Sequence, residues 1–203
     1  MKTNITFALS VNDNDLNKHM KTISGIAFVL CLVISSLSFG QNTIIKMSGM
    51  PYDTISKLIT YKEVVQMKST RDELYVRAIE WIGATYKNAE RVTSKRDREN
   101  GVIEGIARFK INYTDKDGQK SDAGNISYKI LLECKDGRFR FTFNGFNLDS
   151  QSRFPIEKWL NKKDVAYNPS WDQYLKDVDA FMKTLIAGLK KAMQPPVKID
   201  DSW

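Results

Sequence analysis

Residues 126–143 read ISYKILLECKDGRFRFTF, and this stretch decides the fold. Apolar and polar residues alternate on both sides of Asp136-Gly137, which is typical of two half-buried strands. An Asp-Gly pair favours a two-residue hairpin turn, because both central positions need positive φ. The stretch therefore predicts an antiparallel hairpin with one apolar face. That face consists of Ile126, Tyr128, Ile130, Leu132 and Cys134 on the first strand and Phe139, Phe141 and Phe143 on the second.

Two further strands are predicted before this hairpin. Gly105–Tyr113 alternates in the same way, and Asn100-Gly101 predicts another two-residue turn in front of it. Glu90–Asp97 is polar and is typical of an edge strand, whereas Asp115–Gly124 is expected to form a long polar loop. Together the segments predict a four-strand meander with one apolar and one polar face. Within Gly105–Tyr113 the apolar side is Ala107, Phe109, Ile111 and Tyr113.

Two helices and one more strand complete the pattern. Leu58–Met67 is rich in β-branched and aromatic residues and predicts a strand. Thr70-Arg-Asp-Glu73 is a capping box and predicts a helix over Thr70–Tyr86. Ser170-Trp-Asp-Gln173 is a second capping box before a long amphipathic helix that ends at Pro195-Pro196. The order β-α-β-β-β-β-α predicts an α+β fold, in which two helices cover one face of a single antiparallel sheet.

The start of the chain has the layout of a secretory signal peptide. Lys18 and Lys21 precede an apolar run over 23–37, and the small residues Ser38 and Gly40 follow it. A membrane anchor is the alternative, but a spanning helix needs about 20 apolar residues and this run is shorter and interrupted by serines. We therefore expect cleavage after Gly40, export to the periplasm or cell envelope, and no stable membrane span after cleavage.

These features divide the chain into four parts. They are an upstream extension and signal peptide (1–40), a flexible lead-in (41–57), the α+β domain (58–193) and a loose tail (194–203). Residues 41–203 hold 28 basic and 22 acidic residues, a net charge of +6. For an exported chain this mild excess favours an anionic envelope component, or no charged partner, over nucleic acid.

Cleavage also removes most of the groups that catalysis uses. The only histidine, His19, and one of two cysteines, Cys31, lie in the predicted signal peptide. The remaining Cys134 belongs to an apolar row, where a free thiol acts as a small hydrophobic group. Asp115 begins a loop that resembles a calcium site, but Gln119 and Lys120 occupy positions where that motif needs a ligand and a glycine. We expect no enzymatic activity, catalytic residue, cofactor or metal.

The polar side of the predicted meander is the one candidate site. Such a face is suited to an anionic envelope component or to the acidic surface of another envelope protein. The alternative is a solvated strand face, whose long basic side chains only cover the sheet. A different function, carriage of an apolar ligand between the sheet and the C-terminal helix, also stays open. The predicted basic residues of the face are Arg108, Lys110, Lys129, Arg138 and Arg140.

The chain also resembles a known family. The resemblance lies in Tyr61-Lys-Glu-Val-Val65, Glu73-Leu-Tyr-Val-Arg-Ala-Ile-Glu-Trp81, Gly101-Val-Ile-Glu-Gly105 and Leu132-Glu-Cys-Lys-Asp-Gly-Arg-Phe-Arg140. These segments are similar to domain-of-unknown-function family 4468, which has a TATA-binding-protein-like (TBP-like) fold and occurs in exported proteins of Gram-negative bacteria. The resemblance covers about residues 58–193 and implies the fold and export, but no activity. Likeness to the fold of a DNA-binding protein does not imply DNA binding.

Export gives the first testable prediction. The mature protein should begin at or near Gln41 and should be found outside the cytoplasm, because small residues before this position favour cleavage there. N-terminal sequencing of the protein from its native host measures this directly. Soluble cytosolic protein that retains residues 23–37 would contradict the prediction.

Overall fold

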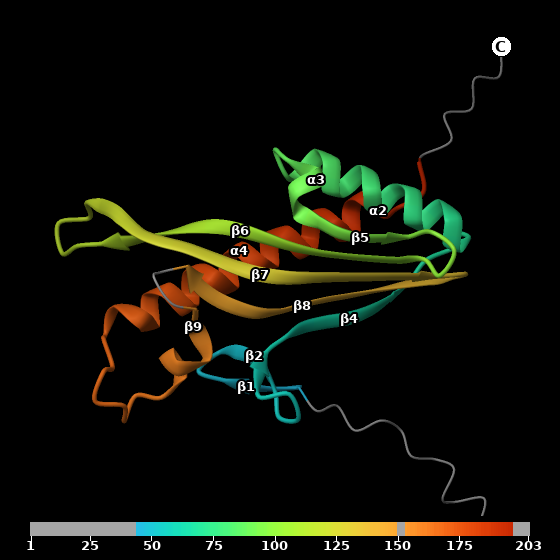
Figure 1. The fold of residues 1–203 in the computed structure, drawn as a ribbon. Coiled ribbons are helices and arrows are strands. Elements are labelled where there is room, and N and C mark those ends of the chain that lie inside the picture. Colours follow the sequence, from blue (N-terminus) through green and yellow to red (C-terminus); the bar gives the residue numbers. More distant parts are fainter. Residues whose placement is uncertain (1–43, 150–152, 197–203) are drawn as a thin grey trace, which may run out of the picture. The chain divides into compact units, whose positions relative to one another are not determined.

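The computed structural model describes residues 44–149 and 153–196 (Figure 1). The predicted signal peptide and residues 197–203 of the predicted tail lie outside the described residues. The described chain forms one large antiparallel sheet with helices on one face, together with a smaller three-stranded sheet. The α+β architecture is therefore as predicted, and the second sheet is an addition to it.

The large sheet has the strand order β4-β8-β7-β6-β5, with β9 paired to β8. Lys135 pairs with Arg138 across the Asp136-Gly137 turn, so the predicted two-residue turn is confirmed, but only Gly137 has a positive φ, of 77°. Cys134 pairs with Phe139, and both are 1% exposed. The strands are β4 (Tyr61–Gln66), β5 (Thr93–Asp97), β6 (Val102–Thr114), β7 (Lys120–Lys135), β8 (Arg138–Asp149) and β9 (Phe154–Pro155).

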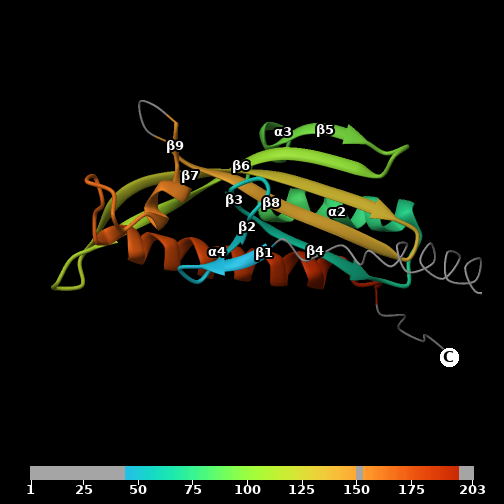
Figure 2. The same ribbon diagram turned by 90° about the horizontal axis from the view of Figure 1, so that it is seen from below.

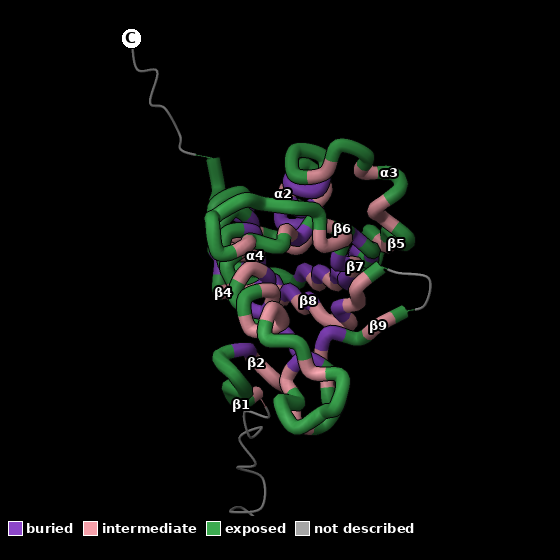
Figure 3. Tube along the Cα trace, turned by 90° about the vertical axis from the view of Figure 1, so that its left-hand side faces the viewer, coloured by how far each residue is buried: buried purple, intermediate pink, exposed green. Residues whose placement is uncertain are grey.

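Helices α2 (Arg71–Thr85) and α4 (Ser170–Ala192) cover the apolar face of this sheet. Figure 3 shows the buried segments gathered between these helices and the strands. The two shorter helices are α3 (Ala89–Val92) and the 3-10 helix η1 (Ile156–Leu160). Within the described residues, no helix is long and apolar enough to cross a membrane.

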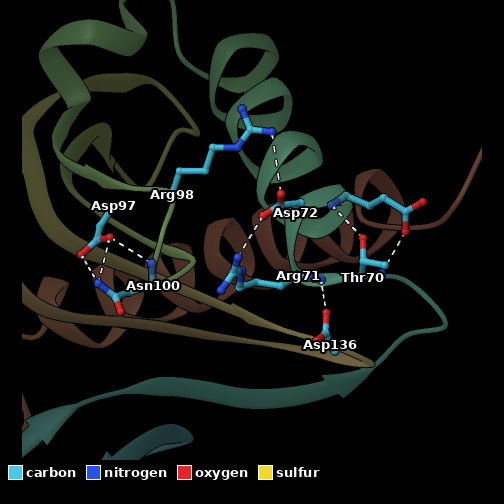
Figure 4. Close-up of polar contacts among 8 residues, drawn as sticks. Thr70, Arg71, Asp72, Asp97, Arg98, Asn100 and Asp136 are labelled. Carbon is cyan, nitrogen blue, oxygen red and sulfur yellow. Dashed lines mark hydrogen bonds and ion pairs between the residues drawn. The ribbon is translucent and has the colours of Figure 1, made fainter.

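The start of α2 is fixed by hydrogen bonds to the β7–β8 turn (Figure 4). The predicted capping box is confirmed, since Thr70 Oγ1 accepts from the Glu73 amide and Glu73 Oε2 accepts from the Thr70 amide. The carboxylate of Asp136 accepts from the amide of Arg71 at 2.7 Å. The Gly137 amide donates to the carbonyl of Ser69 at 2.9 Å. The helix start and the hairpin turn therefore form one hydrogen-bonded unit.

The predicted capping box of the second helix is wrong. α4 begins at Ser170, so this residue is already helical and its side chain is not placed to cap the first turn. Pro169 occupies the N-cap position without a side-chain hydrogen bond, and the side-chain oxygen of Asn168 before it accepts from the Ser170 amide at 2.9 Å. Asp172 in the first turn still suits the positive end of the helix.

The segment before β4 differs from the predicted flexible lead-in. It forms the small sheet of β1 (Ile44–Met47), β2 (Met50–Asp53) and β3 (Leu58–Ile59). The predicted strand over Leu58–Met67 is consequently divided at Thr60 between the two sheets. Met50 and Ile59 are 1% and 0% exposed, and Glu157 in η1 accepts a hydrogen bond from the Ile59 amide at 2.9 Å. These long-range contacts order the segment.

The strands of the meander differ from prediction at their ends. Residues 89–92 form α3 and not part of the edge strand, since the side chain of Asn88 caps them by accepting from the Arg91 amide. The loop expected over Asp115–Gly124 is shorter, because β7 already begins at Lys120. The pairing of β6 with β7 shifts its register between Ile111 and Asn112, where Ala123 of β7 has no partner on β6, and Tyr113 beyond it is 40% exposed in spite of its predicted place in the apolar row.

The turn between β5 and β6 contains four residues and not two. Asp97 ends β5, and its carboxylate accepts from the backbone amide and the side-chain amide of Asn100 (Figure 4). Of Asn100 and Gly101, only Gly101 has a positive φ, of 68°. A Cβ at Gly101 would lie 2.4 Å from the carbonyl oxygen of Cys134. This turn therefore needs glycine for both its conformation and its close approach to β7.

We expect Gly101→Ala to lower the free energy of unfolding by at least ~2 kcal/mol, because alanine disfavours this backbone conformation and its Cβ would overlap β7. Gly83→Ala in α2 is the matched control, since a Cβ there meets nothing within 4 Å. The control should stabilise by about 0.5–1 kcal/mol through helix propensity. Urea unfolding measures both. An unchanged midpoint for Gly101→Ala would show that the turn has another conformation.

Cys134 gives a third prediction. Its side chain is buried, as the alternation predicts, and burial raises the pKa of its thiol to about 12. Because the thiolate is the reactive form, labelling of the folded protein should stay slow up to pH 9 and become fast in denaturant. The increase in absorbance with a chromogenic disulfide reagent measures the rate. Rapid labelling of the native protein at pH 8 would contradict the register of β7.

Candidate functional site

The candidate site is the face of the large sheet that points away from α2 and α4, here called the outer sheet face. Figure 2 views the molecule from this side, with the strands in front of α2. All five predicted basic residues belong to strands of this sheet, where they alternate with buried residues. Arg108 and Lys110 lie on β6, Lys129 on β7, and Arg138 and Arg140 on β8.

Three of these five cations are paired with carboxylates on the same face. Arg108 Nε lies 2.7 Å from Asp149, and Lys110 Nζ lies 2.7 Å from Asp122. Arg140 donates two hydrogen bonds of 2.5 Å to the carboxylate of Glu133. These pairs cancel much of the charge that the sequence places on the face.

The ion pairs also change the acid strength of their members. The hydrogen bond from Arg140 holds the pKa of Glu133 below its usual value, and the same contact raises the pKa of Arg140. The hydrogen bond from Lys110 likewise lowers the pKa of Asp122. Both carboxylates therefore remain charged at neutral pH and hold their basic partners in place.

The unpaired positive charge gathers where β7 and β8 meet in their turn. Lys135 and Arg138 face each other there, and in the described residues no carboxylate oxygen lies within 4.0 Å of the charged nitrogen atoms of either residue. Val64, 48% exposed, lies among these charges and lines a hollow of about 130 Å³ with them. We call this surface the basic end. It comprises Lys62, Lys135, Arg138 and Arg140 with the single acid Glu133.

A second hollow lies in the middle of the outer sheet face and is here called the central hollow. Its volume is about 350 Å³. Ile106, at its wall, is 46% exposed, and Lys129 is also exposed. The wall spans four strands and consists of Ser94, Glu104, Gly105, Ile106, Lys129, Ile130, Leu131, Thr142 and Asn144.

Sequence analysis missed several members of this face. The alternation in each strand places Val64 and Ile106 outside, but an exposed apolar residue carries no functional signal by itself. Asp149 and Asp122 were not recognised as partners because the pairing of β6 with β7 and of β7 with β8 is irregular. Counting residues alone does not give the alignment across such irregularities.

The opposite face of the sheet is filled by side chains. Phe109 on β6 stacks on Phe181 of α4, with 3.9 Å between ring centroids. Val178, Met182 and Leu189 of α4 are 0% exposed. A cleft of about 270 Å³ lies at the rim of this interface, and its walls include polar residues such as Gln173 and Asp177 of α4.

Comparisons with known proteins agree with this architecture. A crystal structure of a DUF4468 family protein from Bacteroides ovatus superposes with a TM-score of 0.55 at 13% identity, covering 78% of this chain and 95% of that chain. A TBP-like protein from Parabacteroides distasonis gives a TM-score of 0.55 at 15% identity, over 74% and 96% of the two chains. At these identities the likeness is one of fold alone. No curated protein sequence matches the chain.

The family comparison covers the strands that form the outer sheet face, together with α2 and α3 on the other side of the sheet. The profile described as "Domain of unknown function (DUF4468) with TBP-like fold" matches residues 61–149, which run from the start of β4 to the end of β8. The resemblance predicted from the sequence is therefore confirmed: residues 61–149 match the DUF4468 family with its TBP-like fold.

Proposed function

We propose that this chain is a non-catalytic binding module of the cell envelope, and that the basic end of its outer sheet face holds an acidic segment of another envelope protein. The observation that carries the proposal is the set of four cations around Glu133 beside the β7–β8 turn, where the Asp136 carboxylate bonds to the Arg71 amide. Exposed charges act over a Debye length of about 8–10 Å, so the cations of neighbouring strands add to one field. A carboxylate-bearing segment is attracted to such a field.

The composition of the face favours a protein over a uniformly anionic polymer. Asp122, Asp149 and Glu133 interrupt the positive charge along the strands and would repel a polyanion that followed them. Val64 and Ile106 are large apolar side chains exposed to solvent on the same face. Interfaces between proteins combine apolar contacts with a charged and polar rim, and this surface offers both.

The envelope location and the non-catalytic role rest on the sequence. The apolar run over 23–37 and its flanking residues support export. After the expected cleavage the chain has no imidazole, and the raised pKa of the buried Cys134 thiol makes it a poor nucleophile. A binding role needs neither group.

The alternative function, carriage of an apolar ligand between the sheet and α4, gains no support. The aromatic and aliphatic side chains of that interface are packed against each other, and the cleft at its rim is small and partly polar. Carriers of apolar ligands enclose most of the ligand surface in an apolar pocket.

The test replaces two of the four cations of the basic end, the pair that flanks the turn, in the variant Lys135→Ser/Arg138→Ser. Arg140 is left unchanged, because its removal would leave the half-buried Glu133 without its partner. A photo-crosslinking residue at Gln66, which pairs with Arg138 from the adjacent strand β4, would report contacts at the basic end. We expect envelope extract to yield a crosslink to an acidic segment, weakened by added salt and by the double variant. Stability should change by less than about 0.5 kcal/mol.

The matched control is Lys116→Ser/Lys120→Ser, which removes two exposed lysines at the far end of the β6–β7 hairpin. It lowers the net charge by the same amount and should leave the crosslink intact. Equal loss of the crosslink in both variants would show that binding depends on the net charge of the protein and not on the basic end. An identical crosslink in the wild type and in Lys135→Ser/Arg138→Ser at low salt would refute the proposed site.

A further inference from the structure

Lys129 is a cation that lies between two ion pairs of the outer sheet face and belongs to neither. On one side along the sheet, Arg108 is paired with Asp149, and on the other side Arg140 is paired with Glu133. In the described segments, no carboxylate oxygen lies within 4.0 Å of the Lys129 ammonium group. The paired arginines are held by their own partners, so Lys129 supplies the unpaired positive charge of the central hollow.

In the strand register, the neighbours of Lys129 are both apolar and polar side chains. Ile106 on β6 and Asn144 on β8 are its direct cross-strand neighbours. The next row along the sheet holds Leu131, with Thr142 beside it on β8. Cross-strand neighbours have Cβ atoms about 5 Å apart, so all these side chains border one hollow. The wall therefore combines apolar surface from Ile106 and Leu131 with a cation, an amide and a hydroxyl group.

The stem of Lys129 lies beside a bulge in β8. Gly145, with φ of 63°, lies at this bulge, and a Cβ built there would be 3.5 Å from Cγ and Cδ of Lys129. A side chain at position 145 would therefore contact the lysine stem, and glycine leaves that space open.

One carboxylate, Glu104, also belongs to the wall of the hollow. Its Oε1 lies 3.8 Å from Nζ of Lys95 on β5, and it pairs with Leu131 and not with Lys129 in the strand register. The charge of Glu104 is therefore partly balanced by a lysine of its own.

We propose that the central hollow is a carboxylate-binding subsite, which takes a glutamate or aspartate side chain of the partner segment together with an adjacent apolar residue. This inference rests on the proposed function and adds a second anchor to it. Lys129 supplies a charge-assisted hydrogen bond to the carboxylate, and Asn144 and Thr142 supply neutral donors. Ile106 and Leu131 receive the apolar neighbour, whose burial adds affinity.

The probes are blocked peptides, which need no knowledge of the natural partner. Acetyl-Leu-Glu-Val-amide carries the required carboxylate, its glutamine analogue lacks the charge, and hexanoate offers the same chemistry without a peptide. Titration of the ¹⁵N-labelled mature protein (41–203) should give saturable amide shifts at 106, 129, 131, 142 and 144 with the glutamate peptide. The glutamine peptide and the variant Lys129→Gln should each weaken binding about tenfold. Lys116→Gln, an equal change of charge at the β6–β7 loop, should bind as the wild type does.

Each outcome decides the inference. Equal shifts with the glutamate and glutamine peptides would overturn it, as would shifts outside the hollow or an unchanged affinity of Lys129→Gln. Binding of hexanoate without binding of the glutamate peptide would overturn the assignment to a protein segment. The crosslink at Gln66 is independent of Lys129. If the peptide does not bind but the crosslink remains, the subsite alone is rejected. If the crosslink is the same in the wild type and in Lys135→Ser/Arg138→Ser, the proposed function is rejected.

Discussion

The register of the β7–β8 hairpin is the constraint on which the rest of the structure depends. The two-residue turn at Asp136-Gly137 places Lys135 opposite Arg138 and Cys134 opposite Phe139. Because side chains alternate with a period of two, a slip by one residue would move every aromatic side chain of β8 into solvent and every cation into the core. The same turn accepts and donates the hydrogen bonds that hold the start of α2. One local turn thus fixes the sheet register, the position of a helix and the charge pattern of the outer sheet face.

The parts of the fold that follow from local patterns were predictable. The alternation over Ile126–Phe143 gave the correct buried row, and Thr70-Arg-Asp-Glu73 gave the correct start of α2. The failures arise where the outcome depends on distant residues. Ile44–Ile59 becomes ordered through contacts with η1, which lies about a hundred residues further along the chain. The start of α4 depends on the preceding turn, in which Asn168 accepts from the Ser170 amide, so that Ser170 is already helical and does not cap the helix.

In the candidate site, too, some features follow from local sequence patterns and others depend on distant residues. Its five cations were predictable because each occupies an outward position in an alternating strand. Their partners were only partly predictable, since Asp122 and Asp149 reach Lys110 and Arg108 across irregular pairings. This pairing changes the interpretation of the face, from a continuous basic platform to a basic end and one isolated lysine. Such a surface distinguishes partners by the positions of their acidic residues more than by their total negative charge.

The bulge at Gly145 also sets the length of whatever the face can accommodate. Phe143 and Phe146 are both buried although they are three residues apart, so the inward and outward positions of β8 change places at this point. Beyond it β8 pairs with β9, and only the first half of the strand, from Arg138 to Asn144, borders the basic end and the central hollow. At about 3.3 Å per residue this is a track of roughly 20 Å. An extended segment of about seven residues spans that distance, which is the length of a short linear motif and far less than the footprint of a folded domain.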